Sequence, residues 1–319
     1  PDQIDLNIKS TSVKRKFLRE IKSLKNLGAN FLRLDAVAYA GKQRGTNCFL
    51  TQETLNFVTW LSKHAHKLDL LVIPEAHHHF KDQLSLANLK GVDYVYDFAT
   101  PFLMLDAIFN SDGEYLKDWL KVRPNNSVSV LDTHDGIGVV DAEDLLPAKR
   151  IKNTCQKIYK NGGNVSLKAS GKSSANVDVY QINTTYYSAL KQDDQAYLLA
   201  RAIQLYLPGL PQIYYVGMLA GKNDEALLNK TKNGRDINRH NFTLREIEEK
   251  KKKKVVKKLF ALCRLRNNHK AFKGEYSLNK TSKHIISITW KYKKHFLSLE
   301  ANLINKEFTI KDEQKDIKI

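Results

Sequence analysis

At 319 residues, the chain is long enough to bury the core of one barrel-sized domain or of two smaller ones. No stretch reaches the roughly 18 consecutive apolar residues that cross a bilayer, and the first residues lack the pattern of a secretion signal, so we expect neither a membrane partner nor export. The three cysteines lie far apart and form no Cys-x-x-Cys pair, which argues against a disulfide framework and favours a reduced, cytoplasmic location.

The net charge of +18 raises the question of a nucleic-acid partner. However, only 12 of the 52 basic residues are arginine, the residue that makes bidentate contacts with phosphates and bases. The lysines are scattered along the whole chain rather than gathered in one segment. We therefore expect no nucleic-acid partner.

Helix-like and strand-like segments alternate through the first 132 residues. Apolar residues at helical spacing predict a helix over residues 12–27, which Gly28 ends. A run that is apolar apart from Arg33 and Asp35 predicts a buried strand over residues 31–37. Such a βα repeat is typical of a parallel sheet or barrel. The same reasoning predicts helices at 51–67, 81–88 and 101–109, and strands at 70–74, 94–98 and 127–132.

The βα alternation breaks at residues 137–190, which we interpret as a long loop or a small inserted subdomain. It resumes with a helix at 194–207 and a strand at 212–217. The remaining segments predict a lysine-rich helix at 246–267 and antiparallel strands at 284–292 and 295–303.

Together these elements predict an α/β fold. A catalytic (β/α)8 TIM barrel would occupy residues 1–270, with the insert at about 137–190, and a small antiparallel β domain would occupy residues 271–319. About five barrel-type strands can be counted, whereas closure of this barrel requires eight. We therefore expect the chain to be the C-terminal portion, about strands 4 to 8, of a longer protein.

Three acidic residues, Asp35, Glu75 and Asp135, each follow a strand-like run. We expect their side chains to converge, because the strand C-termini of such a barrel form its active-site rim. Retaining glycoside chemistry needs a carboxylate nucleophile beside a protonated carboxyl group. Arg33 lies on the same strand face as Asp35 and favours a charged nucleophile. Glu75 follows an apolar run and has no arginine or lysine within three positions, which favours a protonated acid. Asp135 would stabilise the charge that develops on the sugar, with His134 as a neutral hydrogen-bond partner.

Consecutive histidines at positions 77–79 raise the alternative of a metal site. Adjacent residues on a strand or turn do not point the same way, and no cysteine or acidic ligand stands at a usual metal-binding spacing. We therefore expect no metal.

Several motifs resemble those of the sucrose phosphorylases, a group within the α-amylase superfamily, glycoside hydrolase family 13. The resemblance covers almost all of residues 1–290. The α-amylase superfamily is matched by Arg33-Leu34-Asp35-Ala36-Val37, by the Glu75 segment and by Thr133-His134-Asp135. The narrower match to the phosphorylases lies in residues 34–39, 45–49, 122–126, 130–139, 214–217, 219–224 and 233–240.

The resemblance implies a double displacement on sucrose that needs no metal or organic cofactor. Glu75 protonates the departing fructose, Asp35 carries a β-glucosyl ester, and inorganic phosphate releases α-glucose 1-phosphate, while Asp135 stabilises the transition state. The resemblance further implies that substrate is bound by Arg33, His77, His134 and Arg239, and by Tyr180 and Gln181 in a mobile acceptor loop over residues 175–183.

Three alternatives stay open. Pro74 and the histidines at 77–79 depart from the usual sucrose phosphorylase pattern toward relatives that act on sucrose 6'-phosphate, so the acceptor is fructose, fructose 6-phosphate or another alcohol. Water or another alcohol in place of phosphate would make the protein a hydrolase or transglucosidase. A chain without the first barrel half would be an inactive fragment. The expected small-molecule partners are sucrose or a related glucoside and inorganic phosphate. A homodimer is the one protein assembly that we consider.

Overall fold

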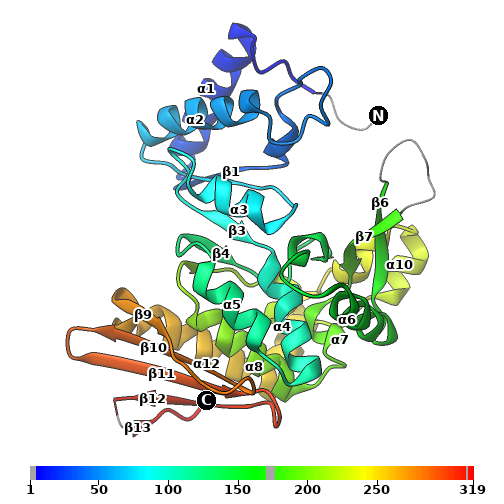
Figure 1. Cartoon of the computed structure of the whole chain (residues 1–319), viewed down its shortest axis with the longest axis vertical. Helices are drawn as coiled ribbons and strands as arrows, with labels where there is room; N and C mark the ends of the chain where they lie inside the picture. Colours follow the sequence, from blue (N-terminus) through cyan, green and yellow to red (C-terminus); the bar gives the residue numbers. More distant parts are fainter. Residues whose placement is uncertain (1–4, 170–176, 314) are drawn as a thin grey trace. The chain divides into compact units, whose positions relative to one another are not determined.

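The computed structural model describes residues 5–169, 177–313 and 315–319, and the chain divides into two compact units. Unit 1 comprises Pro1–Asp97 and Pro124–Val128, and unit 2 comprises Phe98–Arg123 and Ser129–Ile319. Figure 1 shows the helices and strands of both units and labels most of them. Among the described residues, no helix combines the length and the apolar character needed to cross a membrane.

Unit 1 has the βα alternation that the sequence predicts. Its strands β1 and β2 pair in parallel, with Leu34 opposite Pro74 at the end of the ladder. Gly28 follows helix α1 with a φ of +92°, a conformation that glycine adopts without steric cost. In chain order the elements are α1 (Thr11–Asn26), β1 (Phe31–Leu34), the 3-10 helix η1 (Val37–Tyr39), α2 (Gln52–His66), β2 (Leu71–Pro74), α3 (Phe80–Ala87) and β3 (Val95–Asp97).

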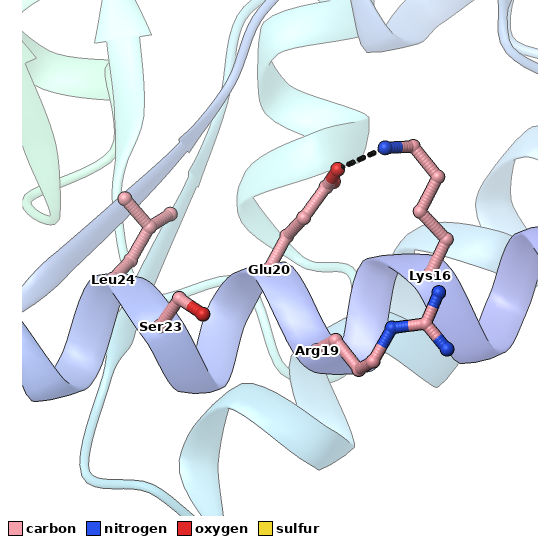
Figure 2. A pocket seen from close by; sticks show the side chains of 5 residues that line it. All are labelled: Lys16, Arg19, Glu20, Ser23 and Leu24. Carbon is pink, nitrogen blue, oxygen red and sulfur yellow. Dashed lines mark hydrogen bonds and ion pairs between the residues drawn. The ribbon is translucent and has the colours of Figure 1, made fainter.

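The core of unit 1 forms where α1 and α2 pack on the two parallel strands. Ile21 of α1, Phe57 and Val58 of α2, Leu32 of β1 and Val72 of β2 belong to one buried apolar cluster. The outer side of α1 is polar, and there Lys16 donates a hydrogen bond of 2.5 Å to Glu20, one turn later (Figure 2). The apolar face of α1 therefore fixes the position of the strands that end at the candidate site.

Unit 2 contains the remaining helices, and its central helix α8 is buried on all sides, in keeping with an apolar sequence. Strand β4 (Ser127–Ser129) begins in unit 1 and ends in unit 2, where the Ser129 carbonyl accepts a hydrogen bond of 2.9 Å from the Gln212 amide. The helices of unit 2 are α4 (Ala99–Asn110), α5 (Glu114–Val122), α6 (Ala148–Lys160), α7 (Tyr186–Ala189), α8 (Asp194–Tyr206), α9 (Tyr215–Met218), α10 (Glu225–Thr231), α11 (Leu244–Lys251) and α12 (Lys254–Asn268).

The segment at 137–190, predicted as a long loop or a small inserted subdomain, contains helices and strands. It contains the 3-10 helix η2 (Val140–Ala142), helix α6 and an antiparallel sheet in the order β5-β7-β6, formed by β5 (Ile137–Gly138), β6 (Asn164–Ala169) and β7 (Val177–Asn183). Cross-strand pairing outweighs the glycine-rich and serine-rich composition that favoured a loop. The predicted loop residues 170–176 lie outside the described residues.

Two other predictions at the element level were wrong. The segment predicted as a strand at 212–217 contains no strand: the short strand β8 (Leu210–Pro211) ends before it, and helix α9 begins within it, because apolar runs of this length fit either state. The segment predicted as one helix at 246–267 is two helices, α11 and α12, which meet at Lys252 and Lys253.

The C-terminal sheet contains the two predicted antiparallel strands, at 284–292 and 295–303, together with further strands that were not predicted. Strands β9 (Glu275–Leu278), β10 (Ile285–Tyr292), β11 (His295–Asn302), β12 (Glu307–Asp312) and β13 (Lys315–Asp316) form one antiparallel sheet in the order β13-β12-β11-β10-β9. Alternate residues of β10 are buried, and the buried Trp290 donates a hydrogen bond of 2.7 Å to the Tyr206 carbonyl of α8. The predicted domain boundary at residue 270 stays a prediction.

A buried ion pair joins helix α8 to the segment that leads to Asp135. The fully buried guanidinium of Arg201 contacts Asp132 at 2.5 Å, and it also donates to the hydroxyl of Tyr197 and to the side-chain oxygen of Gln204. A side chain at Gly217 would collide with both charged groups, since an added Cβ would lie 2.0 Å from an Asp132 oxygen. Unit 2 is therefore closely packed around this pair.

We expect Asp132→Asn to lower the free energy of unfolding by about 3–5 kcal/mol, because it leaves the buried Arg201 charge without its counterion. Urea unfolding followed by circular dichroism measures this change. The matched control is Asp118→Asn, which breaks an exposed pair with Lys121 and is expected to cost at most about 1 kcal/mol. Equal losses in the two variants would contradict the importance of the buried pair.

Candidate active site

The candidate site residues of unit 1 lie where two neighbouring parallel strands end. Asp35 directly follows β1, and Glu75 directly follows β2. The Glu75 amide donates a hydrogen bond of 2.9 Å to the Leu34 carbonyl, which extends the pairing of the strands up to these two acids. The two carboxylates therefore leave the same edge of the sheet, as the sequence predicts for a barrel rim.

Arg33 contacts both of these acids. Its guanidinium donates a hydrogen bond to the Asp35 carboxylate, and a second nitrogen lies 4.0 Å from Oε2 of Glu75. Partial burial alone would lower the pKa of Arg33, but its hydrogen bond to Asp35 and the nearby negative charges raise that pKa above its ordinary value. Arg33 thus stays a cation between the two carboxylates.

Glu75 and Asp35 differ strongly in exposure. The side chain of Glu75 is 10% exposed, whereas that of Asp35 is 68% exposed. Oε2 of Glu75 accepts a hydrogen bond of 2.8 Å from the Ala36 amide, and Oε1 lies 3.7 Å from Nε2 of His77. Ala36 has a left-handed φ of 46°, which turns the chain after β1.

Glu75 has no arginine or lysine within three residues in the sequence, but it has an arginine nearby in the structure. Arg33 is distant in sequence, but it lies on the adjacent strand, so parallel pairing brings it near Glu75. The three consecutive histidines contact different partners. His78 pairs with Asp82 at 2.5 Å, His79 accepts the Lys81 amide at the start of α3, and His77 faces Glu75.

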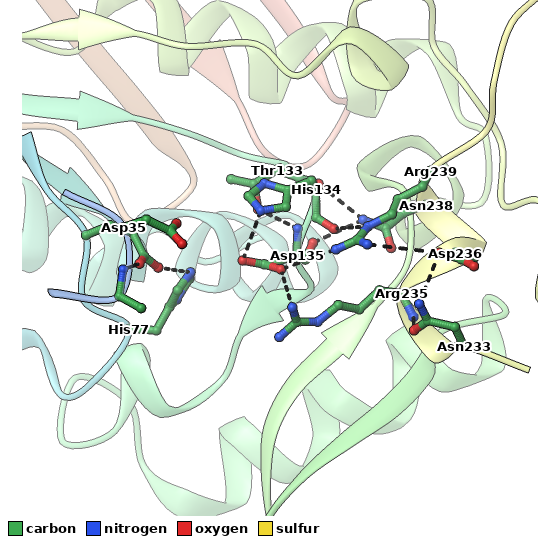
Figure 3. A network of polar contacts seen from close by, with 12 residues as sticks. Asp35, His77, Thr133, His134, Asp135, Asn233, Arg235, Asp236, Asn238 and Arg239 are labelled. Carbon is green, nitrogen blue, oxygen red and sulfur yellow. Dashed lines mark hydrogen bonds and ion pairs between the residues drawn. The ribbon is translucent and has the colours of Figure 1, made fainter. Parts of the chain in front are cut away.

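The candidate site residues of unit 2 surround Asp135. Its carboxylate lies 2.9 Å from Arg235, 3.6 Å from Arg239 and 3.6 Å from Nε2 of His134, and the side chain is 12% exposed. Figure 3 shows both arginines directed toward Asp135. Asp135 thus lies against two guanidinium groups, and a carboxylate at this position can stabilise a developing positive charge.

The 3-10 helix η3 (Gly234–Asn238) places these arginines. Arg235 lies in η3, and Arg239 follows it directly. Asn238 donates hydrogen bonds of 3.1 Å to the carbonyls of Thr133 and Asp135, and Nε of Arg239 donates one of 2.8 Å to the His134 carbonyl. Sequence reasoning included Arg239 but missed Arg235 and Asn238, although both stand in the motif at 233–240 that carries the family resemblance.

The predicted acceptor residues Tyr180 and Gln181 lie in strand β7 rather than in a loop. Gln181 pairs with Gly138 of β5 and is 1% exposed, and the carbonyl of Tyr180 accepts a hydrogen bond of 3.0 Å from the Val139 amide. Residues 175 and 176 of the predicted acceptor loop lie outside the described residues. The role of this segment in binding the acceptor stays a prediction.

Comparison with curated proteins finds strong sequence matches, although no family model matches the chain. Over 300 residues the chain is 42% identical to sucrose phosphorylase of Bifidobacterium adolescentis. This alignment covers 91% of this chain and 59% of that protein. Over 313 residues it is 43% identical to sucrose 6(F)-phosphate phosphorylase of Thermoanaerobacterium thermosaccharolyticum. This alignment covers 97% of this chain and 64% of that protein. The chain thus spans about three fifths of the length of these relatives.

Solved structures agree with the sequence matches. The crystal structure of sucrose 6F-phosphate phosphorylase from Thermoanaerobacter thermosaccharolyticum superposes with a TM-score of 0.94 at 42% identity, over all of this chain and 66% of that one. An α-amylase from H. orenii superposes with a TM-score of 0.66 at 14% identity, a likeness of fold alone. The resemblance and the fold class inferred from the sequence are thereby confirmed: the chain is a homologue of the sucrose phosphorylases and shares the fold of the α-amylases.

Proposed function

We propose that the chain carries the catalytic acids of a retaining glucoside phosphorylase, which transfers glucose from sucrose or a close relative of sucrose to inorganic phosphate. The observation that carries the proposal is the pair of acids at the ends of β1 and β2, one exposed and one buried, with Arg33 in contact with both. Retaining enzymes need two adjacent carboxyl groups in different environments. The relatives include proteins named as phosphorylases of sucrose, sucrose 6(F)-phosphate and glucosylglycerol.

In the first half-reaction, the Glu75 carboxyl group would give its proton to the glycosidic oxygen, and fructose would leave. The exposed Asp35 carboxylate would attack C1 of glucose and form a β-glucosyl ester. Positive charge develops on the sugar ring in this step, and the Asp135 carboxylate, which contacts Arg235 and Arg239, would stabilise it.

In the second half-reaction, a phosphate oxygen would attack the same carbon from the side that fructose left. The phosphate would give its proton to the Glu75 carboxylate, and the bond between C1 and Asp35 would break. The product is α-glucose 1-phosphate, and both acids return to their starting states. Two inversions at one carbon retain the configuration of the substrate.

Phosphate-dependent product formation tests the proposal. The chain is assayed with sucrose, with and without inorganic phosphate, both alone and fused to the part of the T. thermosaccharolyticum relative that it does not match. Formation of α-glucose 1-phosphate only when phosphate is present supports the proposal. Release of free glucose at the same rate without phosphate would indicate a hydrolase instead, and no turnover by the fusion would contradict catalysis by these acids.

A second candidate substrate is sucrose 6'-phosphate. Pro74 and the three histidines after Glu75 favour it, and so does the likeness to the solved sucrose 6F-phosphate phosphorylase. The test compares kcat/KM of the fusion for sucrose and for its 6'-phosphate. A preference of at least about tenfold for the phosphorylated sugar, equal to about 1.4 kcal/mol, would assign the phosphate ester as the substrate.

The proposal extends to location and assembly. All three cysteines are free thiols, and burial raises the pKa of Cys155 to about 11, so this thiol stays protonated and unreactive at neutral pH. Free thiols fit the reducing cytoplasm that we infer for the protein. We further infer that the protein has no nucleic-acid partner, and its assembly as a homodimer can be tested by light scattering during size-exclusion chromatography.

A further inference from the structure

The backbone that carries Asp135 is held by one buried side chain, that of Asn238. Asn238, at the end of η3, is 2% exposed, and its Nδ2 donates to the carbonyls of both Thr133 and Asp135 at 3.1 Å. One amide group thus bridges the first and last residues of the segment 133–135. We propose that Asn238 is a positioning residue, which fixes the orientation of the Asp135 carboxylate for transition-state stabilisation. This inference rests on the proposed function.

The direction of the Asn238 carboxamide follows from its surroundings. Its nitrogen faces two acceptors, so the reversed orientation would place an oxygen against two carbonyl oxygens. Its Oδ1 is buried and has no hydrogen-bond partner among the described residues. The position therefore requires two N–H donors in the shape of asparagine, a requirement that neither an aliphatic side chain nor a carboxylate meets.

Arg239, the residue after Asn238, binds the remaining backbone carbonyl of the segment 133–135. Nε of Arg239 donates to the His134 carbonyl at 2.8 Å, so consecutive residues 238 and 239 bind all three carbonyls of residues 133–135. Arg239 also lies 3.6 Å from the Asp135 carboxylate. Arg239 therefore acts on both backbone and side chain, whereas Asn238 acts through the backbone alone. A change at Asn238 consequently tests the backbone orientation without removing a charge from the site.

Two variants separate positioning from space filling. Asn238→Asp keeps the shape of the side chain but replaces the donors with acceptors, and Asn238→Ala removes the amide. We expect kcat to fall by about 10-fold to 100-fold in both variants, because small displacements of a catalytic group have effects of this size. KM should change less than kcat. If Asn238 only filled space, Asn238→Asp would keep nearly full kcat and Asn238→Ala alone would lose it, which would overturn the proposal.

Asn161 provides a matched control. Its Nδ2 also donates to a backbone carbonyl, that of Ala189, at 2.7 Å, and it lies at the end of α6 in the same unit. Asn161→Asp should leave kcat within about twofold of the wild type, although it removes a hydrogen bond of the same kind. A loss of kcat in Asn161→Asp equal to that in Asn238→Asp would mean that general destabilisation explains both.

A readout without turnover separates this inference from the proposed function. Amide hydrogen exchange of peptides that cover residues 130–138 is compared among the wild type, Asn238→Ala, Asn238→Asp and Asn161→Asp. Faster exchange in the two Asn238 variants alone supports the positioning role, even if the wild type shows no phosphorylase activity. Unchanged exchange in the Asn238 variants would overturn it, even if the phosphorylase activity of the wild type is established.

Discussion

Replacing Asp35 with asparagine is expected to lower kcat for phosphorolysis by about 10,000-fold or more while leaving the fold intact. The amide of asparagine cannot attack C1 of glucose, so the covalent intermediate cannot form, and removal of a catalytic nucleophile has effects of this order. The side chain of Asp35 is 68% exposed and its ion pair with Arg33 lies near the surface, so its removal should cost at most about 1 kcal/mol of folding free energy.

The measurement is kcat of the fused protein together with its melting temperature. Asp82→Asn is the matched control in unit 1, because Asp82 also forms one ion pair, with His78, and lies outside the proposed reaction. We expect Asp82→Asn to keep kcat within about threefold of the wild type, as a change to a partly exposed ion pair affects stability more than chemistry. Substantial activity in Asp35→Asn would show that the nucleophile is a different group.

The sequence was sufficient to predict the elements of unit 1 because their signals are local. The helix before Gly28 shows helical spacing of apolar residues, and the two strands are short apolar runs. An acid that directly follows such a run is placed at the strand end by the chain itself. The positions of Asp35 and Glu75 relative to their strands could therefore be predicted without knowledge of the tertiary structure.

Contacts between segments distant in sequence could not be predicted in the same way. Arg33 contacts Glu75 because two strands pair in parallel, and no local pattern reports that pairing. Arg235 and Asn238 lie about 100 residues after Asp135, and the tertiary fold alone brings η3 to that segment. Local sequence patterns therefore miss the groups that determine the charge and orientation of the predicted acids.

The antiparallel strands of the insert show a second limit of structure prediction from local sequence. The family resemblance implied a mobile acceptor loop around Tyr180 and Gln181, and the glycine-rich and serine-rich stretch before these residues fitted a loop. Nonetheless, residues 177–183 form β7, which pairs with β5 directly after the Asp135 segment. Strand formation here depends on a partner about 40 residues earlier in the chain, so it is a tertiary effect that composition does not report.

Replacing Glu75 with glutamine is expected to produce a loss that depends on the leaving group. A carboxamide cannot donate the proton that fructose needs in order to leave, so kcat for sucrose should fall by about 100-fold to 10,000-fold, the usual contribution of general acid–base catalysis. Fluoride leaves without protonation, so formation of the glucosyl ester from α-glucosyl fluoride should stay within about tenfold of the wild-type rate. The glutamine oxygen can still accept the Ala36 amide, so the local fold should persist.

Pre-steady-state release of fructose from sucrose and of fluoride from α-glucosyl fluoride measures the two rates. Glu20→Gln is the matched control, because Glu20 pairs with Lys16 on the exposed side of α1 and should affect neither rate by more than about twofold (Figure 2). Azide is a nucleophile that needs no general base, so adding it should speed the second half-reaction in Glu75→Gln and yield glucosyl azide. Equal losses with both leaving groups, without a gain from azide, would show that Glu75 positions the substrate and does not transfer the proton. The leaving-group dependence therefore distinguishes an acid–base role for Glu75 from a purely structural one.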